Sequence, residues 1–295
     1  MQQFIFGLAN GSIYSLMALA IGMIYSTTGI TNFSHASMIM LGAMISYWCL
    51  ALFQMSYIAS LLIAITATVI LNIIIYKLCV ERLGDLSKQV GWIVTTFGAS
   101  IILDNMARMI FGTEPQSYPY LFNGKAVEIF GANIMLHEIM MIVIAILIGT
   151  VYESMMQTTR FGRAIRAVSF KPSTARLMGI KSENVILSCF AMAGLVASVA
   201  GALIAPITFA SYTMTSSIGI KGFAAALIGG LGNSRGAFIG GLTLGIVEAM
   251  VATVVPAGFK DAISFLIMII VIIFLPGGIL SAKIFKKGVA SAEKV

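Results

Sequence analysis

Charged side chains are the scarcest component of this sequence. Asp, Glu, Lys and Arg make up only 10% of its 295 residues, against roughly 25% in an average soluble domain. The first 76 residues contain none of them, and the first charge is Lys77. A chain with so few charges and 59% hydrophobic residues is suited to lipid. We therefore expect an integral membrane protein and not a soluble domain.

Residues that serve catalysis or metal binding are equally few. The sequence has two histidines and three cysteines, none of them at the spacing of a metal site. It has no phosphate-binding loop of the GxxxxGKS or GxxxxGKT kind and no set of nucleophile, base and acid. We therefore expect neither a metal site nor a membrane enzyme, and any ATP must be bound by another subunit. Cys49, Cys79 and Cys189 are interpreted as unpaired structural thiols.

Long apolar segments dominate what the sequence does contain, and most have the roughly 20 residues that a spanning helix needs. They lie near residues 4–26, 35–54, 57–76, 92–112, 136–156, 185–208, 218–231, 236–254 and 260–280. The segment at 218–231 is shorter and ends in a Gly-rich turn, which predicts a short or re-entrant helix followed by a full one. The predicted fold is an all-α polytopic bundle of about 8–10 transmembrane helices. We expect it to form one membrane domain over residues 1–295.

The basic residues indicate how the chain is oriented. They occur in 77–91, in 157–184 and in the C-terminal tail, whereas 113–135 carries only Lys125. The positive-inside rule places the first three regions in the cytoplasm and 113–135 outside, with the N-terminus outside and the C-terminus in the cytoplasm. Topology therefore explains the net charge of +7, and we expect no binding of nucleic acid.

The external loop contains a turn signal. Asn123-Gly124 favours a type I′ turn, which predicts a small hairpin between Tyr118–Phe122 and Lys125–Phe130.

The region 157–184, called here the basic island, is the most polar part of the chain. It holds six basic residues and a single acid, Glu183. Pro172 and Gly179 stand at the positions that begin and follow a short helix. A cytoplasmic loop that carries its own helix is a place where a membrane protein can dock a cytosolic partner.

Small residues at four-residue spacing indicate closely packed helices. Such spacings let helix backbones approach each other in lipid, and we favour packing within one subunit over a contact between subunits. They are Gly236/Gly240, Gly241/Gly245 and Ala193/Ala197/Gly201.

Four ionisable residues fall within or beside the apolar segments, where a charge is a functional candidate. Asp104 and Arg108 are spaced i, i+4, so we favour a structural ion pair between them over a role in a pathway. Glu153 is expected to meet the basic island. Glu248 has no basic residue near it in the sequence, which makes it a candidate for a polar group in a cavity or at a partner subunit.

Uncharged polar residues also occur near the spans. Asn32 and His35 lie between the first two apolar segments, and Thr95 and Thr96 lie in the fourth. Capping of a helix and hydrogen bonding between helices are favoured over lining of a pathway.

Several stretches, taken in order, resemble one known family. They are residues 7–16 (GLANGSIYSL), 29–36 (GITNFSHA), 40–43 (MLGA), 159–168 (TRFGRAIRAV), 175–180 (ARLMGI), 222–232 (GFAAALIGGLG) and 276–280 (PGGIL). In this order they resemble the permease subunit of branched-chain amino-acid ABC importers, the LivH type. The resemblance covers roughly residues 7–280, and its specificity lies in the ordered set, since each motif alone is weak.

The resemblance implies a complex in a bacterial or archaeal inner membrane. Its other members would be a second permease subunit, expected to be a different and larger relative, two cytosolic ATPase subunits that bind ATP and Mg²⁺, and an extracytoplasmic solute-binding protein. No cofactor is implied in this chain. Residues 172–178 would be the helix that couples the permease to an ATPase, although Lys171 stands where the family often has an acidic residue.

There are two sets of candidate site residues, one implied by the resemblance and one taken from the polar residues in and beside the spans. The set for coupling is Gly162, Arg163, Arg166, Pro172, Ala175, Arg176, Leu177, Met178 and Gly179. Candidates for the translocation path are Asn32, His35, Thr95, Thr96 and Glu248.

Two alternatives stay open. The same machine could carry urea, short amides or a sugar, because relatives of this fold carry such solutes. A stand-alone secondary transporter or channel is the alternative from another class. Proton coupling usually needs a denser chain of ionisable groups than this sequence has.

Overall fold

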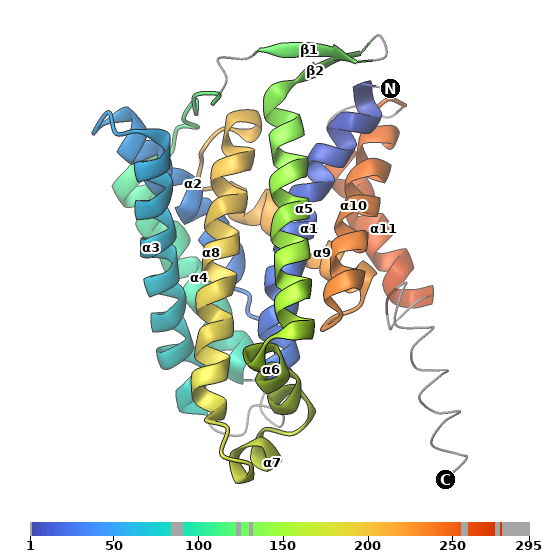
Figure 1. Cartoon of the computed structure of the whole chain (residues 1–295). Coiled ribbons are helices and arrows are strands. Elements are labelled where there is room, and N and C mark those ends of the chain that lie inside the picture. Colours follow the sequence, from blue (N-terminus) through green and yellow to red (C-terminus); the bar gives the residue numbers. More distant parts are fainter. Residues whose placement is uncertain are drawn as a thin grey trace.

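The computed structural model describes residues 2–83, 91–121, 125–129, 132–254, 259–274 and 278. The helices are α1 Gln2–Thr28, α2 His35–Ala51, α3 Tyr57–Ile75, α4 Gly91–Phe111, α5 Leu136–Thr158, α6 Arg160–Phe170, α7 Pro172–Leu177, α8 Ser182–Thr208, α9 Ile220–Gly229, α10 Ser234–Val251 and α11 Lys260–Phe274. The shorter elements are the π-helical turns η1 Tyr76–Val80 and η4 Thr215–Gly219, the 3₁₀ turn η2 Glu81–Leu83, and the strands β1 Ala126–Ile129 and β2 Ala132–Met135. The fold is an all-α membrane bundle, as predicted (Figure 1).

The apolar segments correspond to helices within a few residues. Within the described ranges, six helices are long and apolar enough to cross a membrane, and three shorter apolar helices accompany them. Together they account for the nine segments seen in the sequence. The shorter ones are 35–51, 215–229 and 262–271. The predicted short helix at 218–231 is thus α9 with η4 before it.

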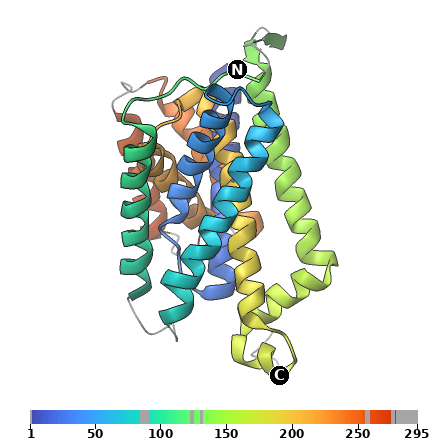
Figure 2. The ribbon, with the colours of Figure 1, turned by 90° about the vertical axis from the view of Figure 1, so that its left-hand side faces the viewer.

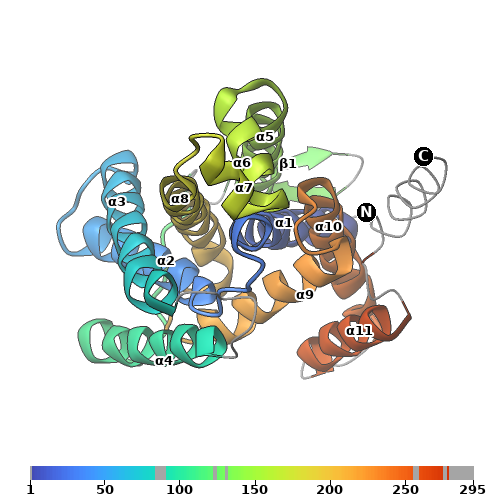
Figure 3. The same cartoon turned by 90° about the horizontal axis from the view of Figure 1, so that it is seen from below.

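Helix α1 lies at the centre of the bundle, with α8, α9 and α10 around it (Figure 3). Its residues are almost entirely buried from Gly7 to Ile24, which is possible in this environment because none of them is charged. α5 contacts α1 but lies at the edge of the molecule (Figures 2 and 3). The core therefore forms around one apolar helix.

Backbone contact between α1 and α10 depends on glycines. A Cβ at Gly241 would overlap the backbone of Ser15, and a Cβ at Gly245 would overlap the backbone of Gly11. At the start of α10, Gly236 meets Gly229 of α9 in the same way. These contacts lie within one chain, which confirms the favoured interpretation of the small-residue spacings.

The same device joins α8 to its neighbours. A Cβ at Gly201 would overlap the carbonyl oxygen of Ile39 in α2. Gly194 lies near the backbone of α3, where a Cβ would be 3.0 Å from the Thr68 carbonyl oxygen and where the Thr68 hydroxyl donates a hydrogen bond to the Gly194 carbonyl at 3.2 Å. Side-chain hydroxyls thus bond across the gaps that the glycines leave open.

The small hairpin of the external loop exists, but its pairing differs from the prediction. β1 pairs with β2, with Ala126 opposite Met135, and not with Tyr118–Phe122. The chain runs directly from β2 into α5, so Ala132–Met135 lies beside β1 at the end of the bundle. The predicted turn at Asn123-Gly124 lies outside the described residues, apart from its flanks.

Adding one methyl group at Gly245 tests the contact between α1 and α10. We expect Gly245→Ala to destabilise the folded protein by about 1–3 kcal/mol, because a Cβ there has no space and backbones must separate. The matched control is Gly22→Ala on α1, where nothing lies within 4 Å of the new Cβ. Thermal unfolding in detergent measures both, and equal stabilities of the two variants would contradict the packing argument.

Candidate coupling surface and intramembrane polar sites

The basic island folds into two helices, α6 and α7, where the sequence analysis predicted one. α6 begins after Thr159, whose hydroxyl accepts a hydrogen bond from the Gly162 backbone N–H at 3.0 Å. Its apolar residues Phe161, Ile165 and Val168 follow the i, i+4, i+7 spacing of an amphipathic helix. That spacing was the signal that could have identified α6 in the sequence.

The apolar face of α6 holds α7 against the base of α8. Ile165 and Val168 form a small buried cluster with Ala175 of α7 and with Val185 and Cys189 of α8. This cluster is separate from the main core of the bundle. We call α6 and α7 together the coupling module; it lies at the end of the molecule opposite the β-hairpin (Figure 1).

α7 has the boundaries that its sequence predicts. It begins at Pro172, and Lys171 precedes it in extended conformation without a side-chain cap. It is followed by Gly179 at φ +82°, a left-handed conformation that favours glycine. There the Ile180 backbone N–H donates to the Ala175 carbonyl at 3.0 Å. The Ser182 hydroxyl also donates to the Pro172 carbonyl at 3.1 Å and ties α7 to α8.

The outer surface of the coupling module is apolar at several points. Leu177 and Met178 are 87% and 79% exposed, and Phe170 is 91% exposed. Ala175 is the buried residue of α7. Large apolar side chains that project from a basic, water-facing segment indicate a binding surface for another protein.

The predicted arginines of the module have different surroundings. Arg176 forms an ion pair with Glu183 at 2.6 Å, and both side chains are about half exposed. Arg166 donates to the backbone carbonyl of Met156, at the end of α5. Arg163 is exposed. Gly162 has a structural reason to be glycine, because a Cβ would overlap the carbonyl of Met156.

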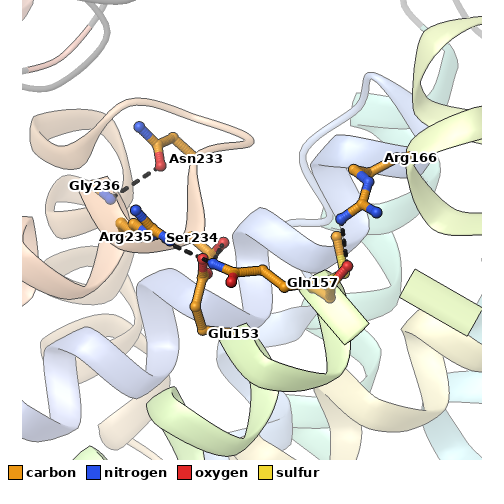
Figure 4. A network of polar contacts seen from close by, with 8 residues as sticks. Glu153, Gln157, Arg166, Asn233, Ser234, Arg235 and Gly236 are labelled. Carbon is orange, nitrogen blue, oxygen red and sulfur yellow. Dashed lines mark hydrogen bonds and ion pairs between the residues drawn. The ribbon is translucent and has the colours of Figure 1, made fainter. Parts of the chain in front are cut away.

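Glu153, near the end of α5, joins the coupling side of the molecule to α10 (Figure 4). Its Oε1 accepts from Arg235 Nε at 2.7 Å and from Gln157 Nε2 at 2.6 Å. Its Oε2 accepts from the Ser234 hydroxyl at 3.3 Å. The sequence analysis expected Glu153 to meet the basic island, but its basic partner is Arg235 at the start of α10.

An apolar cleft of about 280 Å³ lies beside this network and is lined by residues of α1, α5 and α10. Gly149 of α5 and Phe238 of α10 line it, and Glu153 and Arg235 lie at its polar end. The Glu153 network therefore links α5, which continues into the coupling module, to the start of α10, and the Phe238 ring packs on Gly149 farther along the two helices.

A larger open cavity of about 1470 Å³ lies next to the coupling module. Its walls come from the end of α1, from η1, α6, α7 and the start of α8, and from the turn between α9 and α10. Hydroxyls at Ser26, Thr27 and Thr28 and the charges of Arg166 and Glu183 make it partly polar. The cavity is open at the basic end of the bundle.

Glu248 has a basic partner that the sequence analysis missed. Lys221 Nζ of α9 lies 2.7 Å from Glu248 Oε1 of α10, and both side chains are buried. Lys221 was overlooked because its own segment is apolar and short and its partner is 27 residues away. Lys221 also lies 6.0 Å from the ring centroid of Tyr14 in α1, so the pair joins three central helices.

Asp104 and Arg108 do not form the ion pair that their spacing predicted. Asp104 Oδ1 accepts from the hydroxyls of Ser37 and Thr215, each at 2.9 Å. The Arg108 guanidinium lies 4.6 Å from the ring centroid of Tyr212. The competing partners come from α2, η4 and the segment before η4, which helix spacing on α4 alone could not reveal.

The other predicted path residues are engaged mostly with backbone. Asn32 Oδ1 accepts from the Ser34 backbone N–H at 3.1 Å and so shapes the turn before α2. Thr95 donates to the Cys79 carbonyl at 3.0 Å, and Thr96 donates to the Trp92 carbonyl at 2.7 Å. These bonds agree with the favoured roles of local and inter-helix bonding.

His35 is fully buried, and no described residue bonds to either ring nitrogen. Next to it, Phe33 links α2 to α4 and α9: its ring centroid lies 6.4 Å from those of Trp92 and Phe97 and 5.7 Å from that of Phe223. The sequence analysis did not single out Phe33. Of the five predicted path residues, Glu248 is the one that forms an ion pair, with Lys221.

Comparison with known proteins gives a consistent result. A family model described as the permease component of the branched-chain amino acid transport system matches residues 3–272. The high-affinity branched-chain amino acid transport system permease proteins LivH of Salmonella typhimurium and of Escherichia coli are each 32% identical, and the matches cover 95% of this chain and 95% of each relative. The corresponding protein BraD of Pseudomonas aeruginosa is 30% identical with the same coverage. No solved structure gives a significant match.

The buried Lys221–Glu248 pair can be tested by removing one or both charges. We expect Lys221→Met to destabilise the protein by about 3–5 kcal/mol, because the Glu248 carboxylate stays buried without its cation. The double variant Lys221→Met/Glu248→Leu should recover most of this loss, since no charge then remains. Thermal unfolding measures stability, and solute uptake by the double variant shows whether the pair has a further role.

The control for this prediction is the exposed Arg176–Glu183 pair. Loss of Arg176 there should change stability by less than about 1 kcal/mol, because water solvates the remaining charge. A Lys221→Met protein as stable as the unmodified chain would show that the pair is not what holds α9 to α10.

Proposed function

The chain belongs to the family of branched-chain amino acid transport system permease components, and we propose that it is the membrane-spanning permease of an ATP-driven importer of branched-chain amino acids. In this proposal α7 is the element that docks on a cytosolic ATPase subunit. The observation that carries it is the coupling module, a packed helix pair at the basic end of the bundle with exposed apolar residues.

The position of the module supports a docking role. Its exposed residues Phe170, Leu177 and Met178 are accompanied by exposed arginines and lysines, so lipid does not cover them. Its inner face packs on α8 through the Ile165 cluster. A displacement of α7 would therefore be transmitted to α8, which is long enough to span the membrane. Coupling by rigid-body movement needs such a connection.

The charge distribution supports the orientation. The coupling module and η1–η2 lie toward one end of the bundle, and the N-terminus and the β-hairpin lie toward the other (Figure 1). We place the basic end in the cytoplasm and the hairpin end outside. Two ATPase subunits with ATP and Mg²⁺ would then bind below, a solute-binding protein above, and a second, larger permease of the same family beside the chain.

The solute is assigned from the relatives, whose names give branched-chain amino acid transport and which match this chain over 95% of their own length. Urea, short amides and sugars are the competing cargoes, and the ligand of the associated binding protein distinguishes them. Uptake by the purified chain alone without ATP would instead indicate a channel or secondary transporter.

The docking surface is tested with Leu177→Asp and Met178→Asp. We expect each variant to insert and fold normally, because both side chains are largely exposed, and to lose at least tenfold in binding-protein-stimulated ATP hydrolysis and in leucine uptake, about 1.4 kcal/mol or more. Copurification with the ATPase subunits should fall in parallel.

The matched control is Val127→Asp on β1, an exposed apolar residue at the opposite end. It should leave ATPase copurification unchanged. Normal ATPase binding and uptake in both α7 variants would remove α7 from the docking surface, while leaving the permease assignment intact.

A further inference from the structure

Asp104 and Arg108 lie one helical turn apart on α4 and yet bind other groups. The hydroxyls of Ser37 and Thr215 both donate to Asp104 Oδ1 at 2.9 Å, and Ser100 shares a 2.9 Å hydrogen bond with Ser37. These three hydroxyls are buried. The carboxylate is thus held by α2, α4 and η4 and kept from the neighbouring guanidinium.

The other half of the carboxylate is differently placed. Within the described residues no hydrogen bond goes to Asp104 Oδ2, and this atom is not one of the buried polar atoms without a partner. Asp104 as a whole is half-buried. One oxygen is therefore fixed by the protein, and the second is accessible beside α4.

Arg108 is also held in place without being neutralised. Its guanidinium lies over the face of Tyr212, 4.6 Å from the ring centroid, and the residue is exposed on this chain. A cation–aromatic contact orients an arginine but leaves its N–H donors free to bind an anion. Arg108 lies in the last turn of α4, where a long side chain can extend to the membrane surface, so its guanidinium can be reached from water.

Some polar residues also occur near the two charges, among the exposed apolar residues of α4. Thr213 and Ser216 are exposed on the segment that carries Tyr212 and Thr215, and Asn105 is exposed on α4. η4 is a π-helical turn, a local widening that is frequent at functional sites.

We propose that Asp104 and Arg108 form a subsite for a zwitterionic α-amino acid, with the carboxylate of Asp104 binding the α-ammonium and the guanidinium of Arg108 binding the α-carboxylate. Side chains at i and i+4 have Cβ atoms about 5–6 Å apart, a separation suited to two opposite charges carried by one carbon atom. Both contacts are charge-assisted hydrogen bonds.

Pre-organisation favours the ligand over the internal ion pair. Because Ser37 and Thr215 hold the carboxylate and Tyr212 holds the guanidinium, an incoming amino acid does not have to break a salt bridge between them. The inference rests on the proposed function, since it assigns to the amino acid a place within this permease.

Leucine and two of its fragments test the subsite. In the complex purified with its partner subunits, with Cys49, Cys79 and Cys189 replaced by Ala, Ser216→Cys provides one exposed thiol beside Thr215. In the absence of ATP, the rate at which this thiol reacts with a water-soluble maleimide reports whether a ligand occupies the subsite. We expect leucine to slow this reaction at a concentration at least tenfold lower than either fragment requires. The fragments are 3-methylbutylamine, which lacks the carboxylate, and 4-methylpentanoate, which lacks the ammonium.

Two variants should separate the charges. Asp104→Asn keeps an acceptor for Ser37 and Thr215, and it should weaken protection by leucine and by the amine while sparing protection by 4-methylpentanoate. Arg108→Gln should do the reverse and spare 3-methylbutylamine. Glu114→Gln and Lys125→Gln, exposed charges outside the spans, are the controls and should behave as the parent protein.

The outcomes are distinct. Equal protection by all three compounds, equal loss for all three in both variants, or no protection by leucine in the parent would each overturn the subsite. Leucine-dependent ATP hydrolysis by the parent complex is measured in parallel. Its absence would count against the proposed function, whatever the labelling shows.

Discussion

Close backbone contact between α1 and α10 is the constraint on which the rest of the structure depends. Lipid gives two apolar helices no reason to associate through their side chains, so packing and hydrogen bonds must hold them. Gly241 and Gly245 let α10 lie directly on Ser15 and Gly11 of α1. Once this register is fixed, the start of α10 brings Arg235 to Glu153, and its far half brings Glu248 to Lys221. Both halves of α10 thus form an ion pair with another helix.

Charged residues in the bundle fall into two kinds, according to whether the partner is itself charged. Lys221 and Glu248 satisfy each other in a buried position and join α9 to α10. Asp104 and Arg108 are each held by uncharged groups, and their charges are not cancelled within the pair. A buried, matched pair stabilises or specifies a packing, whereas unmatched charges held in place at an open edge are suited to a ligand. This difference, and not the mere presence of charge in a span, separates structural from functional candidates here.

The sequence analysis succeeded where local pattern determines structure and failed where distant segments do. Length and hydropathy place the spans within a few residues because every buried backbone group in lipid must be bonded inside its own helix. Pro172 and Gly179 likewise define α7 locally. In contrast, Asp104 takes its partners from α2 and η4, so spacing along one helix gave it the wrong partner, and Glu248 takes its partner from α9, which spacing along α10 could not reveal. α6 was not predicted, although its residues Ile165 and Val168 have the spacing of an amphipathic helix and pack in a buried cluster.

Under the docking role proposed for α7, α5 connects the coupling module to the membrane interior. α5 and α6 are separated only by Thr159, and Arg166 reaches back to the α5 backbone at Met156, so the coupling module and the end of α5 move together. Farther along, the Phe238 ring of α10 packs on Gly149 of α5, and at this end the two helices are connected by the Glu153 network. Its members are partly exposed, and exposed ion pairs contribute little to stability. A link that is weak in energy but fixed in geometry can break and re-form as the module moves, while the glycine-packed contact of α10 with α1 stays intact.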